Sequence, residues 1–202
     1  MTNVTLSYFD FSGGRGEECR LALHLAGIEF NDDRIGFKDW PTRKPTTPYG
    51  AVPVLSIEGK PDLAQSNAIL GFIGEQHDLL PSDRFEAALH IGVMNYVEEL
   101  NMQIGITISL DDEQKKAMRI KLVEGFMKEW ASMIEKHIQS PFVGGEKISV
   151  ADIKLYILVG WVKSGILDHI PKDFFDSSSK LIGVYDAVGK HPKVAEWNSR
   201  HN

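Results

Sequence analysis

The hydrophobic period of the chain changes near residue 80, and this change constrains the fold more than any other feature. Before it, short strand and helix patterns follow one another in the order β-α-β-loop-β-β-α. After the breaker-rich connector HDLLPSDR at residues 77–84, every pattern is helical. The sequence therefore predicts two domains, a small α/β domain at residues 1–78 and an all-α domain at residues 84–202.

The predicted elements of the first domain are short, as in a compact α/β unit. The alternating segment VTLSYF predicts a half-buried strand, and a helix with a glycine-rich entry follows it and stops at Gly27. The remaining elements are a strand at 31–35, a polar loop with three prolines at 36–50, a strand at 53–57, a returning strand at 61–64 and a helix at 66–77.

The helical patterns of the second domain share an apolar residue at every third or fourth position. They run over 89–108, 118–134 and 147–165, and a last short helix begins at Pro192. Ser149 and Asp152 have the spacing of a capping box, which marks the start of the third of these helices.

Composition and charge exclude several kinds of partner. Lys and Arg total 22 against 28 Asp and Glu, a net charge of -6 without a basic run, so nucleic acid is not expected. No apolar segment approaches the roughly 18 to 20 residues that span a bilayer, and the amino terminus lacks a signal-peptide pattern, so no membrane is expected. The single cysteine, Cys19, excludes an internal disulfide and is interpreted as a packing residue. We therefore expect a cytoplasmic protein.

No metal site is predicted. The seven histidines form no pair with metal-ligand spacing on a shared helix, and the acidic pair Asp111-Asp112 is interpreted as the start of a helix.

The segment GAVPVLSIEGKPDLAQSNAI raises a question about its proline. Pro53 cannot donate to a ladder, yet it directly precedes the apolar strand VLSI. Taken alone, Pro53 is a strand-leading residue, Ser66 is a helix cap and Tyr8 is a half-buried strand aromatic. A functional interpretation of these residues depends on the whole pattern of motifs.

Several motifs occur in a fixed order along the whole chain. Tyr8 ends the first strand, TTPYGAVPVL and LAQSNAI follow it, and SVAD begins a helix in the second half. Together they resemble the cytosolic glutathione transferases from end to end, and KDWPTRKPTTPYGAVPVL with the tyrosine resembles the sigma class most. The resemblance implies a thioredoxin-like, glutathione-binding domain at 1–78 and an all-helical domain at 84–202 that forms the pocket for an electrophile.

The resemblance also implies a glutathione site around Pro53. In this fold the proline is cis, so the backbone of Val52 turns outward and pairs with the peptide. Gln65 and Ser66 lie beside that edge, at a helix start whose dipole favours the γ-glutamyl carboxylate.

The glycyl carboxylate of glutathione is expected to meet the long loop, and its ammonium group is expected to meet the partner subunit. By the family pattern, Trp40 and Lys44 hold the glycyl carboxylate. A homodimer is expected, in which Glu98 of the partner subunit reaches the glutathione ammonium, with Glu99 as the alternative.

Catalysis by such a protein requires a thiolate. A free thiol has a pKa of about 8.5, and lowering it by two units favours the reactive form by about 2.7 kcal/mol. The resemblance gives this role to Tyr8, whose hydroxyl donates to the sulfur, with added positive potential from Arg15. The turn YFDFSGGRGE has one residue more than the sigma pattern, which leaves the placement of Arg15 open and Ser12 as an alternative activator.

The electrophile pocket is expected between the domains, with apolar walls at Phe9, Phe11, Met102 and Ile106. The predicted function is conjugation of the glutathione thiolate to small hydrophobic electrophiles, with glutathione as co-substrate. One alternative is a glutathione-dependent isomerase like the prostaglandin D synthases, which carry aromatic residues where this chain has NMQIGITI and Lys154. Another is a non-catalytic, crystallin-like relative, which would be expected to lose the thiol-activating groups.

Overall fold

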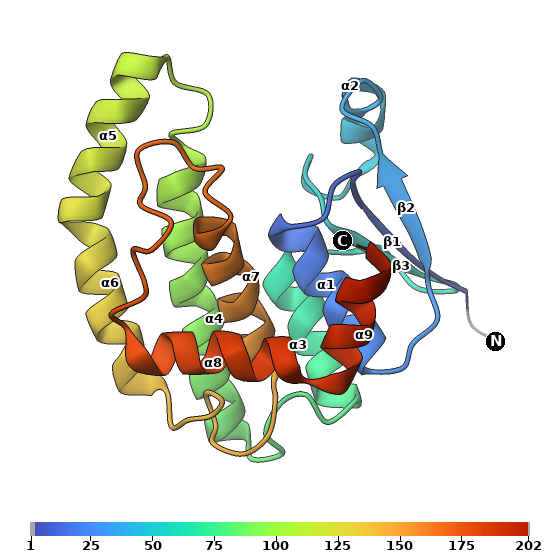
Figure 1. Ribbon diagram of the computed structural model, residues 1–202. Coiled ribbons are helices and arrows are strands. Elements are labelled where there is room, and N and C mark those ends of the chain that lie inside the picture. Colours follow the sequence, from blue (N-terminus) through green and yellow to red (C-terminus); the bar gives the residue numbers. More distant parts are fainter. Residues whose placement is uncertain (1–2, 202) are drawn as a thin grey trace. The chain divides into compact units, whose positions relative to one another are not determined.

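The computed structural model describes residues 3–201 of the chain and divides it into two compact units. The described residues up to Ser82 form the amino-terminal unit together with those from His191 onward, and Asp83–Lys190 form the carboxyl-terminal unit. The last helix, α9 (Pro192–His201), packs on the first helix, α1 (Gly14–Leu25), and is grouped with the amino-terminal unit for that reason (Figure 1).

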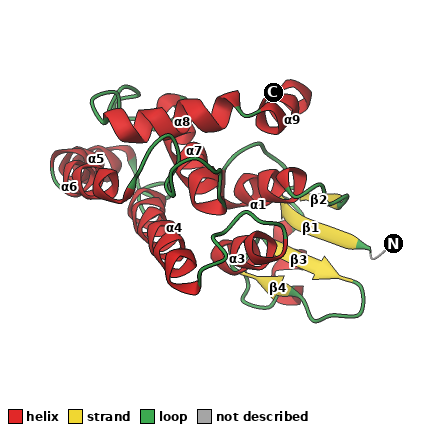
Figure 2. Cartoon of the chain, turned by 90° about the horizontal axis from the view of Figure 1, so that it is seen from below, coloured by secondary structure: helices red, strands yellow, loops and turns green. Residues whose placement is uncertain are grey.

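A mixed sheet of four strands forms the amino-terminal unit's scaffold. Its strand order is β2-β1-β3-β4, with β1 parallel to β2 and antiparallel to β3, and β3 antiparallel to β4. The strands are β1 (Val4–Phe9), β2 (Asn31–Ile35), β3 (Val54–Ile57) and β4 (Leu63–Ala64). Helices α1 (Gly14–Leu25) and α3 (Ser66–Gln76) pack on each other and cover one face of the sheet (Figure 2). The thioredoxin-like arrangement is thus confirmed.

Strand β1 is more buried than its alternating pattern predicts. Leu6, Ser7 and Tyr8 are all buried, although a half-buried strand would expose the middle residue. The Ser7 hydroxyl donates to the carboxylate of Asp33 on the neighbouring strand β2 at 2.7 Å, so the buried hydroxyl has a hydrogen-bond partner.

The predicted polar loop at 36–50 contains helical turns. Helix α2 (Trp40–Arg43) is followed by a 3-10 turn at Lys44–Thr46. Each has a proline in its first turn, where a missing N–H removes no helical hydrogen bond. Arg43 of α2 forms an ion pair with Asp33, so this segment is fastened to the sheet.

The carboxyl-terminal unit contains only helices among its regular elements in residues 83–190. They are α4 (Arg84–Gly105), α5 (Asp112–Glu124), α6 (Phe126–Ile134), the 3-10 turn Glu135–His137, α7 (Val150–Lys163) and α8 (Ser179–Lys190). Gly125, between α5 and α6, has φ -111° and ψ -98°, which breaks the stripe that we predicted to run over 118–134. The all-α class of this unit is confirmed, and none of the helices within residues 3–201 has the length and apolar character needed to cross a membrane.

The predicted capping box at the start of α7 is confirmed. The Asp152 carboxylate accepts from the Ser149 amide at 2.8 Å, and from the Val143 amide at 2.7 Å. The ring of His90, buried on α4, lies 3.0 Å from the Ser149 hydroxyl. These contacts fix the amino end of the apolar helix α7 against α4.

Candidate active site

Tyr8 lies at the end of β1 and is buried, with 6% of its surface exposed. Its ring packs directly on Gly16 of α1, where an added Cβ would lie 2.0 Å from the Tyr8 Cδ1. Burial raises the pKa of Tyr8 to about 12, although the charge of Arg15 and a hydrogen bond from the Gly16 backbone act to lower it. The hydroxyl therefore stays protonated near neutral pH and keeps a proton to donate.

The lengthened turn before α1 brings backbone close to this hydroxyl. Gly13 and Gly14 have φ of 133° and 60°, in the left-handed region that glycine adopts most readily. A Cβ on Gly14 would lie 2.8 Å from the Tyr8 hydroxyl oxygen. The two glycines thus absorb the additional residue, and α1 begins at Gly14, which places Arg15 in its first turn.

A pocket beside this turn is lined by five of the residues that we predicted to bind or activate glutathione. Its lining consists of Arg15, Tyr49, Ala51, Val52, Pro53, Ala64, Gln65 and Ser66. The Val52–Pro53 peptide bond is cis, as the resemblance implied. Sequence reasoning missed Tyr49, Ala51 and Ala64, although the first two lie within the motif TTPYGAVPVL that signalled the site.

The start of α3 differs from the prediction. Gln65, not Ser66, occupies the cap position, without a capping hydrogen bond from its side chain, and Ser66 is the first helical residue. Gln65 has φ 73° and ψ 120°, a conformation that costs a non-glycine residue about 1 to 3 kcal/mol. Ser66 is 5% exposed. The strained residue and the serine both line the pocket at a helix amino end, where an anion is favoured.

Trp40 lies on α2 and Lys44 on the 3-10 turn that follows it, and we call these two elements together, residues 40–46, the α2 segment. Neither residue lines this pocket. Trp40 is half-buried and meets the ring of Phe9 edge-on at 5.2 Å, and Lys44 is exposed. The segment's anchor, Asp33, has a lowered pKa: burial acts to raise it, and hydrogen bonds from Ser7 and Arg43 outweigh that effect.

Aromatic rings continue from Tyr8 into the following turn. Phe9 and Phe11 each have their ring centroid 5.5 Å from that of Tyr8. The two expected apolar contacts from this unit therefore lie directly beside the candidate catalytic residue. The remaining two, Met102 and Ile106, belong to the other unit, where they are 59% and 54% exposed at the end of α4.

Glu98, expected to act across a dimer, forms an ion pair within its own unit. Its carboxylate lies 3.2 Å from the ammonium of Lys154 on α7, a lysine with no exposed surface. Glu99, the alternative, is exposed on α4. Lys154 thus holds the Glu98 carboxylate, while Glu99 is the more accessible of the two.

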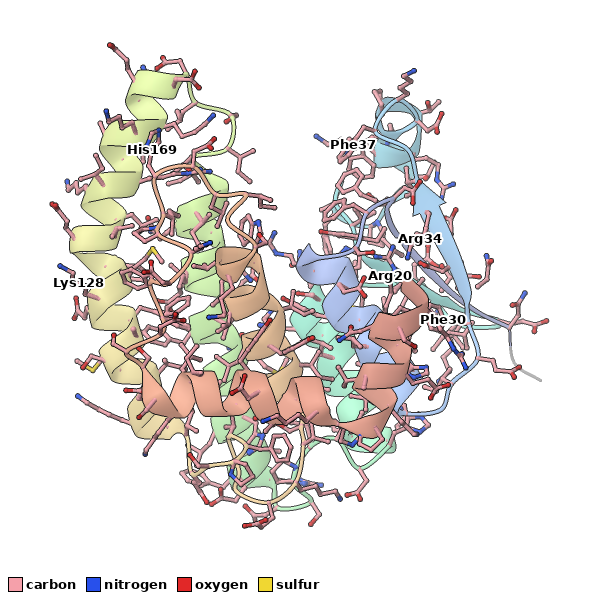
Figure 3. The ribbon with its side chains drawn as sticks, in the orientation of Figure 1. Arg20, Phe30, Arg34, Phe37, Lys128 and His169 are labelled. Atoms are coloured by element: carbon pink, nitrogen blue, oxygen red, sulfur yellow. The ribbon has the colours of Figure 1, made fainter. Side chains whose placement is uncertain are left out.

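Sequence reasoning missed Arg20, which is fully buried and projects from α1 (Figure 3). Its guanidinium donates to the carbonyl of Phe11 at 3.0 Å and to the carbonyl of Phe9 at 3.3 Å. An arginine in a helix pattern carries no signal of burial, so only the tertiary structure identifies it. Cys19, next to it, is fully buried, in agreement with its interpretation as a packing residue.

Two family models match the chain. The model for "Glutathione S-transferase, N-terminal domain" matches residues 4–75, and the model for "Glutathione S-transferase, C-terminal domain" matches residues 98–201, about half of the chain. The chain belongs to the glutathione S-transferase family. Its co-substrate is therefore glutathione, and the family assignment agrees with the site around Tyr8 and the cis Val52–Pro53 bond.

Individual proteins and solved structures resemble the chain over nearly its whole length. It is 27% identical to "Glutathione S-transferase 1" of Ascaris suum, over 98% of this chain and 96% of that protein. The solved structure of a prostaglandin synthase D of Nilaparvata lugens is 27% identical, with a TM-score of 0.88 over 99% of this chain and 98% of the other. A sigma class GST of Fasciola hepatica, 23% identical over 100% of this chain and 97% of the other, has the same fold, with a TM-score of 0.86.

Proposed function

We propose that this glutathione S-transferase joins the glutathione sulfur to small hydrophobic electrophiles, with Tyr8 as the hydrogen-bond donor to the thiolate. The observation that carries the assignment is a buried Tyr8 hydroxyl within a few ångströms of the glycine turn that begins α1. A phenol with a pKa of about 12 donates to a thiolate without giving up its proton.

Glutathione binding is proposed to use the pocket beside this turn. The outward backbone of Val52, before the cis Pro53, pairs with the peptide backbone of glutathione. The γ-glutamyl carboxylate is taken by Ser66 and Gln65 at the amino end of α3, where backbone amides lack helical partners and the dipole favours an anion. Arg15, on the pocket wall, contributes positive charge.

In the reaction, the thiol proton leaves to solvent and the thiolate remains, hydrogen bonded to Tyr8. The sulfur lone pair forms the new S–C bond, and the electron pair of the electrophile leaves with a halide or is neutralised by a proton from water. Tyr8 keeps its proton throughout. The lower thiol pKa follows from the hydrogen bond and from the nearby Arg15 charge.

Contacts to the glycyl carboxylate and to the ammonium group of glutathione are proposed from the family pattern. Trp40 and Lys44 hold the glycyl carboxylate, and the α2 segment that carries them is fastened by Arg43 and Asp33. We also propose that the protein is cytoplasmic and detoxifies electrophiles. It is proposed to form a homodimer, in which a carboxylate of the partner subunit binds the glutathione ammonium. Glu98 is our first candidate and Glu99, more exposed, is the second.

An isomerase is the second candidate function, because the chain is similar to the solved structure of a prostaglandin synthase D of Nilaparvata lugens. Such an enzyme returns glutathione unchanged, whereas a transferase consumes one thiol for each product formed. Glutathione binding is measured by calorimetry, and thiol loss is followed with aryl halides, enals and a prostaglandin endoperoxide. Hydroperoxides are assayed separately, because their reduction consumes two thiols and forms glutathione disulfide and not a conjugate. We expect thiol loss with one or more of the hydrophobic electrophiles. Conversion of the endoperoxide alone, without thiol loss, supports the isomerase, and absence of glutathione binding contradicts both functions.

A further inference from the structure

The α2 segment has no buried residue of its own, although it carries two of the side chains proposed to bind glutathione. It follows β2 in the chain and lies just beyond the end of that strand (Figure 1). Trp40, at its start, is half-buried and meets the ring of Phe9 edge-on. Because little apolar surface is removed from water here, polar contacts have to hold the remainder of the segment in place.

One ion pair joins the α2 segment to the sheet. The Arg43 guanidinium donates to the carboxylate of Asp33 on β2. The same carboxylate oxygen accepts from the hydroxyl of Ser7 on β1 at 2.7 Å, and Ser7 is buried. Two neighbouring strands therefore fix the position of the Asp33 carboxylate, and Asp33 in turn fixes the position of Arg43.

Lys44, the next residue, lies against the loop that forms part of the pocket. A Cβ on Gly50 would lie 3.5 Å from the Lys44 Cε and 3.9 Å from its Cγ, so the lysine stem crosses Gly50. Tyr49 and Ala51, on either side of Gly50, both line the pocket. No residue within 3–201 supplies a hydrogen bond or an ion pair to the Lys44 ammonium. Its positive charge is therefore available to a ligand beside the pocket.

Hydrogen bonds stiffen the backbone that connects the ion pair to Lys44. The Thr46 hydroxyl donates to the Arg43 carbonyl at 2.8 Å, and the Thr47 hydroxyl donates to the Lys44 carbonyl at 2.9 Å. Arg43 ends α2 and Lys44 begins the 3-10 turn, so no loop residue separates them. A displacement of Arg43 therefore also displaces Lys44.

We infer that Arg43 is a positioning residue for glutathione, because its ion pair with Asp33 holds the Lys44 ammonium where it binds the glycyl carboxylate. The inference rests on the proposed function, in which the γ-glutamyl carboxylate is bound at Ser66. Glutathione has one other carboxylate, on its glycine, and Lys44 is a cation beside the same pocket. The protein should therefore distinguish glutathione from the same peptide without the glycyl charge, and this discrimination should depend on Arg43.

The ion pair acts on ligand affinity more than on the stability of the unit. The side chains of Arg43 and Asp33 are 43% and 28% exposed, and an ion pair with this exposure adds little to folding stability. Binding is more sensitive, because a side chain that is ordered only when the ligand arrives loses its conformational freedom in that step. With the ion pair in place, the segment that carries Lys44 is ordered before glutathione binds.

The test compares glutathione with its glycyl ethyl ester, which has the same peptide without that negative charge, by calorimetric titration of the full chain. Arg43→Met removes the guanidinium, Arg43→Lys keeps a cation, and Asp33→Asn keeps an acceptor for Ser7 without the charge. Lys38→Met is the matched control, because Lys38 is an exposed cation just before α2.

We expect Arg43→Met and Asp33→Asn to weaken glutathione binding about 3- to 10-fold and binding of the ester by less than 2-fold. Arg43→Lys should recover part of the glutathione affinity, and Lys38→Met should change neither ligand. In turnover, the KM for glutathione should rise in Arg43→Met while kcat at saturating glutathione stays within about 2-fold, since the ion pair does not touch the sulfur.

The outcomes separate this inference from the proposed function. If glutathione binds the unaltered protein and Arg43→Met weakens both ligands equally, or neither, the inference is wrong and the glutathione site stands. The same holds if the unaltered protein binds the ester as tightly as glutathione. Unfolding of both Arg43→Met and Asp33→Asn under the conditions of the assay would also overturn the inference, because the ion pair would then serve the fold. If neither ligand binds the unaltered protein, the proposed function fails and the inference fails with it.

Discussion

The guanidinium carbon of Arg20 lies over the ring of Tyr8, 5.7 Å from the ring centroid. The same guanidinium donates to Asp32 at 2.9 Å and to Glu17 at 3.2 Å, in addition to the two carbonyls of the Tyr8 turn. Arg20 has no exposed surface, so it is a buried cation that joins two carboxylates to the two carbonyls beside Tyr8. This arrangement makes Arg20 a positioning residue for Tyr8 and connects the active site to the stability of the unit.

Replacement of Arg20 by Met should lower the free energy of unfolding by about 3 to 5 kcal/mol, because it leaves two carboxylates without their buried partner. Arg34→Met is the matched control, since Arg34 contacts the same Asp32 at 2.7 Å but is 28% exposed (Figure 3). Its loss should cost about 1 kcal/mol or less. Urea unfolding measures both values, and similar losses in the two variants would contradict the proposed role of Arg20.

A hydrogen bond connects the last helix to this network. The indole N–H of Trp197 donates to the buried Glu17 carboxylate at 2.6 Å, and the other oxygen of Glu17 accepts from Arg20. Trp197→Phe keeps a ring and removes the donor, which should lower the free energy of unfolding by about 1 to 3 kcal/mol. Ser199→Ala, on the exposed part of α9, should stay within about 0.5 kcal/mol of the unaltered protein. Equal effects of the two changes in urea unfolding would show that the indole donor does not fasten α9.

Tyr8 should also give the protein a distinctive response to alkaline pH. Its pKa rises from 10.0 to about 12 on folding, so the folded state binds the proton more tightly than the unfolded state. The stability that this gives is fully present below pH 10 and is lost as pH rises through 12. At pH 11, midway between the two pKa values, the loss reaches roughly 1.4 kcal/mol.

The measurement is urea unfolding between pH 9 and pH 11 for the unaltered protein and Tyr8→Phe. Tyr8→Phe should lack this part of the alkaline loss. Tyr49→Phe removes a phenol that is 70% exposed and should follow the unaltered protein. Parallel curves for all three proteins would mean that burial does not hold the Tyr8 proton.

Gly16 should be required for the position of the Tyr8 ring. A methyl group there would lie 2.0 Å from the Tyr8 Cδ1, and the buried ring has to shift to admit it. We expect Gly16→Ala to lower the free energy of unfolding by about 1 to 3 kcal/mol and kcat by 10-fold or more. Gly71→Ala, in α3 with no atom within 4 Å of the added group, should be neutral or slightly stabilising. Turnover of Gly16→Ala near that of the unaltered protein would contradict the contact.

The sequence predicted those features that are local or belong to a familiar motif. Periodicity identified β1 and α7 because their patterns and the Ser149 cap lie within single segments. The cis bond at Pro53 came only from the family resemblance, since nothing in the residues themselves favours that isomer. Gly125 could have indicated that the helical pattern over 118–134 is interrupted, and Pro41 could have indicated the first turn of α2.

Other features depend on residues that are far apart in the chain. Glu17 and Trp197 are separated by 180 positions, and no pattern in either helix indicates their hydrogen bond. The exposed ring of Phe37 stacks on the rings of Phe9 and Phe11, which belong to another segment of the chain. Gln65 adopts a backbone conformation that its residue type disfavours, so propensity pointed to Ser66 as the cap. Tertiary structure, rather than local preference, determines all three.

Tyr8→Phe and Ser66→Ala should separate activation of glutathione from its binding. If Tyr8 acts only on the sulfur, Tyr8→Phe leaves glutathione affinity nearly unchanged and lowers turnover by roughly 10- to 1000-fold, because a donor to an anion contributes about 1.5 to 4 kcal/mol. Ser66→Ala removes a group from the end of the pocket proposed to bind the γ-glutamyl carboxylate, so glutathione binding should weaken by about 1 to 3 kcal/mol. The pKa of the thiol that remains bound should change little in this variant.

Calorimetric titration with glutathione reports the affinity in both variants, and the thiolate absorbance of the bound complex against pH reports the thiol pKa. In Tyr8→Phe the thiol pKa should rise towards about 8.5, its value in a free thiol. A low thiol pKa with unchanged turnover in Tyr8→Phe would transfer the role of activator to Ser12 or Arg15 in the lengthened turn. The proposed glutathione-binding role of the pocket around Val52, Pro53 and Ser66 does not depend on that outcome, because glutathione affinity alone tests it.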